Sequence, residues 1–277
     1  MGEANCRSLV SYFAAIGKID DPKLRRWLKL ALSSALRPAS RWLSGSIKAQ
    51  IDPDRLPTPI GPHFLRSARA LKRDCSAENS SLATNTPVFV YRADATMLPL
   101  RDQSIDAIIT SPPYWKMYDY FDVHRLTYLA FVWCYQAPRQ IGRFYGIGRD
   151  GAEFIAPRYM KSWYMRHFRQ EETCNGRSLR AYWSSMRQHI TEAKRVLRDG
   201  VVVAYAIANP VRNGRRFALA QALAGVLEEV GFQDVELRRR EQSHRRILPS
   251  GRDTRTGRFS SNASSASVEE YVVYARH

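Results

Sequence analysis

The spacing of apolar residues changes character near residue 87. Before that point apolar residues recur at helical spacing. Residues 18–48 begin with an Asp-Asp-Pro signal, in which an acidic cap precedes a proline at the first helical position. Residues 63–74 form a second helical patch, and the polar run 76–86 is typical of a linker. The pattern predicts a helical extension and linker over residues 1–86.

After residue 86, strands alternate with helices. Residues 104–111 are almost continuously apolar, as in strands buried on both faces of a parallel sheet. Such alternation predicts an α/β fold with a mostly parallel sheet. The last two strands are joined without a helix, which predicts an antiparallel strand at one edge. The expected strands are 87–94, 104–111, 201–210, 233–242 and the last eleven residues, and the expected helices are 178–198 and 217–232.

Composition indicates a globular chain that attracts polyanions. Hydrophobic residues make up 44% of the sequence, enough for a sizeable core. The 43 Lys and Arg residues outnumber the 26 Asp and Glu residues, which gives a formal net charge of +17. A field of this sign favours nucleic acid as the partner. An acidic membrane surface or an acidic protein is the alternative.

The cysteines and the apolar runs bear on location. The four cysteines are widely scattered and lack the spacing of a zinc site or a redox pair. We therefore expect a reducing cytoplasm and no metal site. No apolar stretch approaches the roughly 20 residues that span a bilayer, so we expect no membrane association.

A hydroxyl residue, two prolines and two aromatic residues end the strand at 104–111. Proline cannot continue a central strand, because it lacks a ladder donor and fixes φ. The chain therefore stops in one stiff shape that presents Ser111, Tyr114 and Trp115 at the carboxyl end of a buried strand. Open α/β sheets place their chemistry at this end. The alternative is that Pro112 and Pro113 only terminate a core strand.

The run RADATMLPLRDQSIDAIITSPPYWKMYDY at 92–120 resembles the amino-group DNA methyltransferases. These enzymes transfer a methyl group from S-adenosylmethionine to an exocyclic nitrogen of adenine or cytosine. Their catalytic motif is Asp, Asn or Ser, then Pro-Pro, then Tyr or Phe, and here it reads Ser111-Pro112-Pro113-Tyr114. The likeness covers roughly residues 87–277. It implies a methyltransferase-like, Rossmann-like catalytic domain over these residues.

The residue types suit that chemistry. The Ser111 side chain and the Pro112 carbonyl are two acceptors for the hydrogens of an amino group whose lone pair is otherwise delocalised. Proline holds the carbonyl rigidly, and Tyr114 offers a flat face for a base rotated out of the duplex. Trp115 is expected to extend that platform. Asp119 and Tyr120 are candidates for the same substrate mouth, with a surface cap and a packing residue as their alternatives.

The resemblance is incomplete for the residues that bind the cofactor in this family. Asp94 matches the acidic turn that in the family lies beside the cofactor's adenine, and a purely turn-forming Asp is the alternative. The family's glycine-rich turn, Asp-Pro-Phe-x-Gly-x-Gly, has no convincing copy. Residues 144–148 match Phe-x-Gly-x-Gly literally, but neither an apolar strand nor Asp-Pro precedes them. The predicted sheet therefore lacks its first strands.

Three explanations fit this gap. The chain is half of a split enzyme whose partner subunit carries the glycine-rich motif, or a relic that only binds nucleic acid, or an enzyme with a diverged cofactor site. The intact catalytic motif favours the split enzyme. A start at residue 1, ahead of helices that in relatives lie between the two halves, favours it too. A catalytically silent nucleic-acid-binding subunit is the alternative from another class.

The target base follows only from a tendency of the family. Serine at the first motif position favours cytosine N4 over adenine N6, and RNA in place of DNA is an alternative substrate. An insertion at about 136–177 mixes arginines with aromatic residues, which suits phosphate contact and base stacking. We expect it to recognise the DNA target, and a solvated face with aromatic core packing is the alternative. The basic run 238–246 is a second phosphate-binding candidate, with a plain solvated strand as its alternative.

Overall fold

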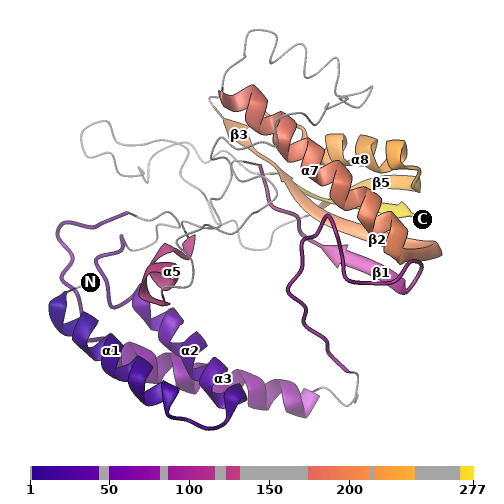
Figure 1. Cartoon of the computed structure of the whole chain (residues 1–277). Helices are drawn as coiled ribbons and strands as arrows, with labels where there is room; N and C mark the ends of the chain where they lie inside the picture. The colour runs from indigo at the N-terminus through magenta and orange to yellow at the C-terminus, as the bar shows by residue number, and fades with distance from the viewer. Residues whose placement is uncertain are drawn as a thin grey trace. The chain divides into compact units, whose positions relative to one another are not determined.

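The computed structural model describes two units, which are considered separately (Figure 1). The first comprises Met1–Val90 and Tyr118–Pro138, and the second comprises Tyr91–Met117 and Arg139–His277. The described residues are 2–43, 50–81, 87–115, 123–131, 174–212, 215–240 and 269–277.

The first unit is helical. Asp21 caps one helix by accepting a hydrogen bond from the Lys23 N–H at 2.7 Å, with Pro22 at the first helical position, as the sequence predicts. Leu32, Leu36, Ile60 and Phe131 pack in one core cluster. The helices are α1 (Glu3–Gly17), α2 (Pro22–Leu36), α3 (Ile60–Ser81) and α5 (Arg125–Phe131).

Asn5 joins three segments of this unit. It is buried, and its amide donates to the carbonyls of Ala39 at 3.1 Å and Thr58 at 2.8 Å. Its side-chain oxygen accepts from the N–H of Ile60 at 3.1 Å, at the start of α3. One side chain thus satisfies three backbone groups that would otherwise be costly to bury.

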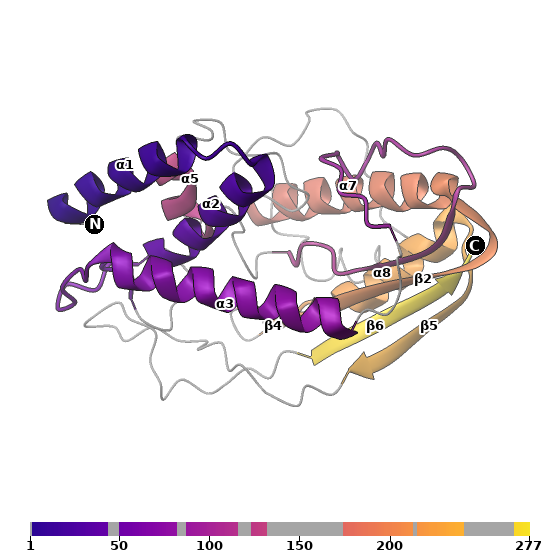
Figure 2. The same cartoon turned by 90° about the horizontal axis from the view of Figure 1, so that it is seen from below.

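The second unit contains a four-stranded mixed sheet in the order β1-β2-β6-β5. Figure 2 shows β6 between β2 and β5. Strand β1 runs parallel to β2, and β6 runs antiparallel to both β2 and β5. Therefore β1, β2 and β5 share one direction, and β6 alone opposes them. The strands are β1 (Ile105–Thr110), β2 (Leu197–Asn209), β5 (Gln233–Arg240) and β6 (Glu269–Arg276).

These strands confirm the α/β class and correct two details of the prediction. Of the three pairings within this sheet, as far as the chain is described, only β1–β2 is parallel, so the sheet is mixed and not mostly parallel. The last two strands pair antiparallel at one edge of the sheet, as predicted, but β6 is interior and β5 forms the edge itself. An interior place suits β6 because Val273 and Ala275 are 0% and 2% exposed.

The strand expected at 87–94 does not form. No ladder forms there among the described residues, and the only pairing is an isolated bridge between Asp94 and Met97. Val88 and Val90 are 85% and 90% exposed. A β-branched run makes a strand only when a neighbouring strand and a packed face receive it.

Helices α7 (Cys174–Val196) and α8 (Leu219–Val230) share one core cluster with the sheet (Figure 1). Alternate residues of β2, namely Val203, Tyr205 and Ile207, belong to this cluster, because successive strand residues point to opposite faces. Helix α8 ends at Gly231 in the left-handed region, φ 94°, as the sequence predicts. A short hairpin, β3 (Val211–Arg212) and β4 (Arg215–Arg216), precedes α8.

Within the described residues, none of the helices combines the length and the apolar character needed to cross a membrane.

Candidate active site at the carboxyl end of β1

Ser111 follows directly on β1 and lies beside the neighbouring parallel strand. Its hydroxyl is 3.1 Å from the carbonyl oxygen of Ala206 on β2 and 3.3 Å from the hydroxyl of Tyr114. Ser111 is exposed, whereas the next residue, Pro112, is buried. The motif therefore combines a fixed backbone with an accessible hydroxyl at the carboxyl ends of two parallel strands.

Tyr114 is tied across the sheet to β6. Its hydroxyl donates to the Oε1 atom of Glu270 at 2.7 Å. Arg240 on β5 lies 3.4 Å from the other carboxylate oxygen. The Glu270 side chain is 12% exposed, and Tyr114 packs partly against the core. Three strands, β2, β5 and β6, thus contribute to holding Ser111 and Tyr114.

Trp115 occupies a different place from the one predicted. It is 1% exposed and belongs to the hydrophobic core of the second unit. Its ring lies 4.9 Å from that of Phe217, at an interplanar angle of 52°. In this conformation Trp115 offers no accessible face for a base. It serves instead as a core anchor for the end of the motif.

Asp94 lies at the start of a loop that leads into β1. Its Oδ1 atom accepts from the Thr96 N–H at 2.9 Å and from the Thr96 hydroxyl at 2.7 Å. Its carbonyl accepts from the Met97 N–H at 2.9 Å. The side chain is exposed and shapes its own turn, as the turn-forming alternative requires. A cofactor contact is compatible with this geometry, since the carboxylate is accessible.

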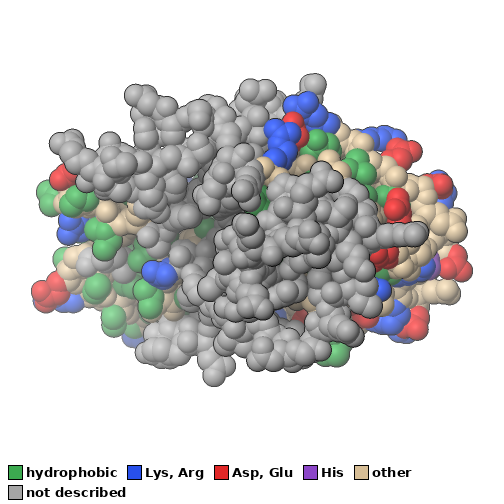
Figure 3. Space-filling model, turned by 90° about the horizontal axis from the view of Figure 1, so that it is seen from above, with side chains coloured by type: hydrophobic (Ala, Val, Ile, Leu, Met, Phe, Trp, Pro, Cys, Tyr) green, Lys and Arg blue, Asp and Glu red, His purple; other side chains and the backbone are tan. Residues whose placement is uncertain are grey.

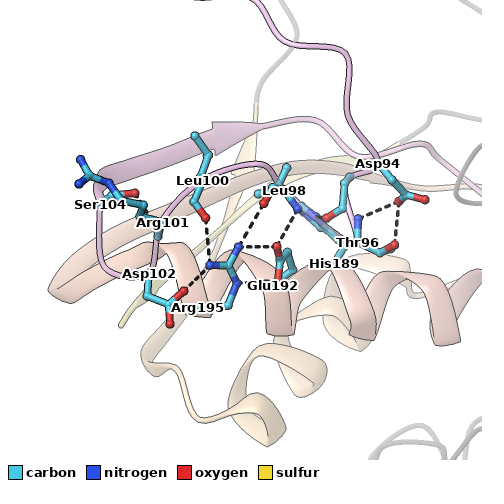
Figure 4. Close-up of polar contacts among 11 residues, drawn as sticks. Asp94, Thr96, Leu98, Leu100, Arg101, Asp102, Ser104, His189, Glu192 and Arg195 are labelled. Carbon is cyan, nitrogen blue, oxygen red and sulfur yellow. Dashed lines mark hydrogen bonds and ion pairs between the residues drawn. The ribbon is translucent and has the colours of Figure 1, made fainter.

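The loop that begins at Asp94 is clamped to α7 (Figure 4). Glu192 accepts from the Leu98 N–H at 2.7 Å. Arg195 donates to the carbonyls of Leu100 at 3.0 Å and Leu98 at 3.2 Å, and it pairs with Asp102. The hydrogen bonds from Arg195 hold the pKa of Glu192 below its ordinary value, although burial opposes this.

His189 lies one turn before Glu192 on α7 and also binds this loop. Its Nδ1 atom is 3.0 Å from the Ala95 carbonyl, which can only accept, so Nδ1 carries the hydrogen. The Nε2 atom then accepts from the Tyr205 hydroxyl at 3.0 Å. Burial lowers the pKa of His189, and it raises the pKa of Tyr205. The neutral tautomer fits both partners.

Several predicted site residues cannot be placed. Asp119, Tyr120, residues 144–148 and most of the insertion at 136–177 lie outside the described residues. In the basic run 238–246 only the first three residues are described.

Two of the three described arginines of that run pair with carboxylates. Arg238 pairs with Glu236 at 2.9 Å, and its guanidinium lies 5.2 Å from the centre of the Tyr274 ring. Arg240 pairs with Glu270. On the coloured surface of Figure 3, Lys and Arg side chains likewise lie among Asp and Glu side chains.

Metal ligands were not predicted. In the part of the chain that the structure describes, no three His, Cys, Asp or Glu side chains are arranged to hold a metal ion.

Sequence reasoning missed Glu270 and the clamp residues of α7. One signal for Glu270 existed: two acidic residues open an otherwise apolar final strand. Because β6 is antiparallel to β2, and β1 is parallel to β2, the start of β6 lies at the same end of the sheet as the carboxyl end of β1. The clamp has a weaker signal, because Glu192 and Arg195 also look like an ordinary exposed pair three residues apart on a helix.

Compared with models of known protein families and with curated proteins, the chain matches none. A function can therefore be inferred only from the residues of the site.

Proposed function

We propose that this protein is part of an amino-group DNA methyltransferase that acts on cytosine N4 in preference to adenine N6. The observation that carries the proposal is the Ser111–Tyr114 turn. It follows a strand of an α/β sheet at its carboxyl end, and it combines an exposed hydroxyl, a buried proline and an aromatic residue. Open α/β sheets use this position for ligands.

An exocyclic amino group needs acceptors to become a nucleophile. The Ser111 oxygen and the Pro112 carbonyl are two such acceptors on adjacent residues. Hydrogen bonds to them would localise the nitrogen lone pair and stabilise the charge that develops on nitrogen. Methyl transfer would form a nitrogen–carbon bond as the sulfur–carbon bond of the methyl donor breaks, with the electron pair of that bond left on sulfur and the amino proton released to water.

Tyr114 is the proposed stacking residue for a base rotated out of the duplex. Its ring is half-buried, and its hydroxyl is held by Glu270 at 2.7 Å, so its orientation is fixed before a base arrives. Preorganisation of this kind lowers the cost of binding. With Trp115 in the core, the proposed platform consists of Tyr114 alone among the described residues, while Asp119 and Tyr120 remain predicted substrate contacts.

S-adenosylmethionine would supply an electrophilic methyl group on a sulfonium sulfur. Asp94 suits one part of such a cofactor, because its exposed carboxylate can accept from a hydroxyl or an amino group. The clamp on α7 holds the loop that carries Asp94. We propose that a partner subunit contributes the glycine-rich turn that the sequence lacks.

The edge of the sheet at β1, as the described residues form it, supports a partner subunit. Among the described strands β1 has one neighbour, β2, and its Ile109 is 86% exposed. Parallel strands are normally covered on both sides, and an open edge is a template for a further strand. The proposed partner would extend the sheet beside β1.

Net charge and free thiols bear on the proposed substrate and the proposed location. The net charge of +17 supports duplex DNA as the substrate. The thiols of Cys6 and Cys75 are free, which supports the reducing cytoplasm as the location.

The test is transfer of a labelled methyl group to duplex DNA by this chain, with and without the product of a neighbouring reading frame that encodes Asp-Pro-Phe-x-Gly-x-Gly. We expect transfer by the mixture, reduced about a hundredfold or more by Ser111→Ala, because one preorganised acceptor is removed. Tyr271→Phe is the matched control. It also removes one hydroxyl, which donates a hydrogen bond to Glu269 at 3.0 Å.

Unchanged transfer by the Ser111→Ala mixture would contradict the proposal. If DNA binding also required this chain, that result would favour the catalytically silent subunit.

A further inference from the structure

A chain of hydrogen bonds links an interior strand to the proposed catalytic serine. Glu270 on β6 accepts from the Tyr114 hydroxyl at 2.7 Å. The Tyr114 oxygen lies 3.3 Å from the Ser111 hydroxyl, and the Ala206 carbonyl lies 3.1 Å from that same hydroxyl. The direction of these bonds follows from the groups involved.

An ionised carboxylate can only accept, so Tyr114 must give its single hydrogen to Glu270. The Tyr114 oxygen can then only accept from Ser111. The Ala206 carbonyl is also only an acceptor. The one hydrogen of Ser111 is therefore committed to Tyr114 or to Ala206. Toward any further group, the Ser111 oxygen presents lone pairs.

Glu270 is itself held in place. Its side chain is 12% exposed, and Arg240 supplies a positive charge 3.4 Å away. Its backbone is paired on both sides, with Ala208 on β2 and with Arg240 on β5. A group fixed in this way needs little reorganisation during a reaction.

We propose that Glu270 is a positioning residue that sets the direction of the hydrogen bonds through Tyr114, so that Ser111 faces a substrate amino group as an acceptor. The inference rests on the proposed function and adds a residue from the far end of the chain. Without Glu270, the Tyr114 hydroxyl can turn and donate to Ser111. It then occupies one of the two lone pairs of the Ser111 oxygen, which makes that oxygen a weaker acceptor for the amino group.

The neighbouring residue is a natural control. Glu269 also binds a tyrosine hydroxyl and an arginine, Tyr271 at 3.0 Å and Arg216 at 2.6 Å. Burial alone would raise the pKa of Glu269, but these partners hold it below its ordinary value. Successive strand residues point to opposite faces, so Glu269 serves the other side of β6.

The experiment combines Glu270→Ala, Tyr114→Phe and the double variant in the methyl-transfer assay with the partner subunit. We expect Glu270→Ala to lower kcat about tenfold or more and to change the KM for DNA little, since the lost interaction acts in the transition state. In the Tyr114→Phe background the same substitution should have almost no further effect. Glu270→Gln should retain part of the rate, because its amide oxygen can still accept, and Glu269→Ala should leave the rate unchanged.

An equal loss of kcat from Glu270→Ala in both backgrounds would overturn the inference, and so would no loss. Urea unfolding of the wild type, Glu270→Ala, Tyr114→Phe and the double variant gives a second double-mutant cycle, which measures stability and does not depend on activity. Coupling between positions 114 and 270 supports the contact, and strictly additive effects would refute it. A wild-type mixture without methyl transfer would refute the proposed function, while the unfolding cycle would still report on the contact.

Discussion

The two ends of β1 use the same kinds of side chain for different purposes. At the amino end, Glu192 and Arg195 of α7 bind backbone groups of Leu98 and Leu100. At the carboxyl end, Glu270 binds the hydroxyl of a side chain, and the chain of bonds ends at an exposed serine. Both ends contain a carboxylate with an arginine beside it.

The difference lies in what the polar groups satisfy. A loop that turns away from regular structure leaves backbone groups that need partners, and the clamp on α7 supplies them. The carboxylate at the carboxyl end satisfies a hydroxyl that could have found other partners, and it thereby orients Ser111. We therefore expect substitutions at the amino end to change stability most, and those at the carboxyl end to change the rate most.

The largest stability effect should come from Glu192→Ala. This side chain is 13% exposed, and its loss removes the acceptor for the Leu98 N–H and one partner of Arg195. We expect the free energy of unfolding to fall by about 2 kcal/mol, the typical cost of an unsatisfied group. Urea denaturation measures it, with the exposed Glu228→Ala on α8 as the control. If both substitutions lowered the free energy of unfolding equally, the contacts of Glu192 would contribute no more to stability than an exposed side chain does.

A smaller effect should come from His189→Gln, and it should depend on pH. Burial lowers the native pKa of His189 from its ordinary value of 6.5, so the unfolded chain binds a proton before the native chain does. Stability from this group is present above pH 6.5 and is lost as the pH falls through the native pKa. Unfolding of the wild type at about pH 7 and about pH 5 should show this loss, and the variant should show a flatter dependence. The same slope in both proteins would exclude His189 as its source.

The smallest effect should come from Asp106→Asn, within β1 itself. Asp106 pairs with Arg198 on β2, but the two side chains are 75% and 55% exposed. Exposed pairs are screened by solvent and contribute little. We expect a change in unfolding free energy within the error of a urea titration, and unchanged methyl transfer. A clear loss of either would show that charge along β1 matters as much as its two ends.

Much of the second unit could be predicted from sequence. Apolar runs located β1, β2 and β6, and Gly231 located the end of α8, because these signals are local. The strand predicted at 87–94 did not form because Val88 and Val90 have strand propensity, but none of the described strands lies beside them.

The site was predictable only in part. Ser111 and Tyr114 belong to a contiguous motif, whereas Glu270 reaches them through the pairing of β6 with β2, which no local signal fixes. Trp115 was expected to extend the stacking platform for the base, but it is buried in the core. Its packing against Phe217 depends on where the chain turns after the prolines, and sequence spacing does not specify that direction.

The most direct test of the account is nucleoside mass spectrometry of DNA treated with the wild-type chain and its partner, and with the Ser111→Ala chain and the same partner. The account predicts N4-methylcytosine, or N6-methyladenine, in the first sample and a loss of about a hundredfold or more in the second. Methylated amino groups at equal levels in both samples, or in neither, would contradict it.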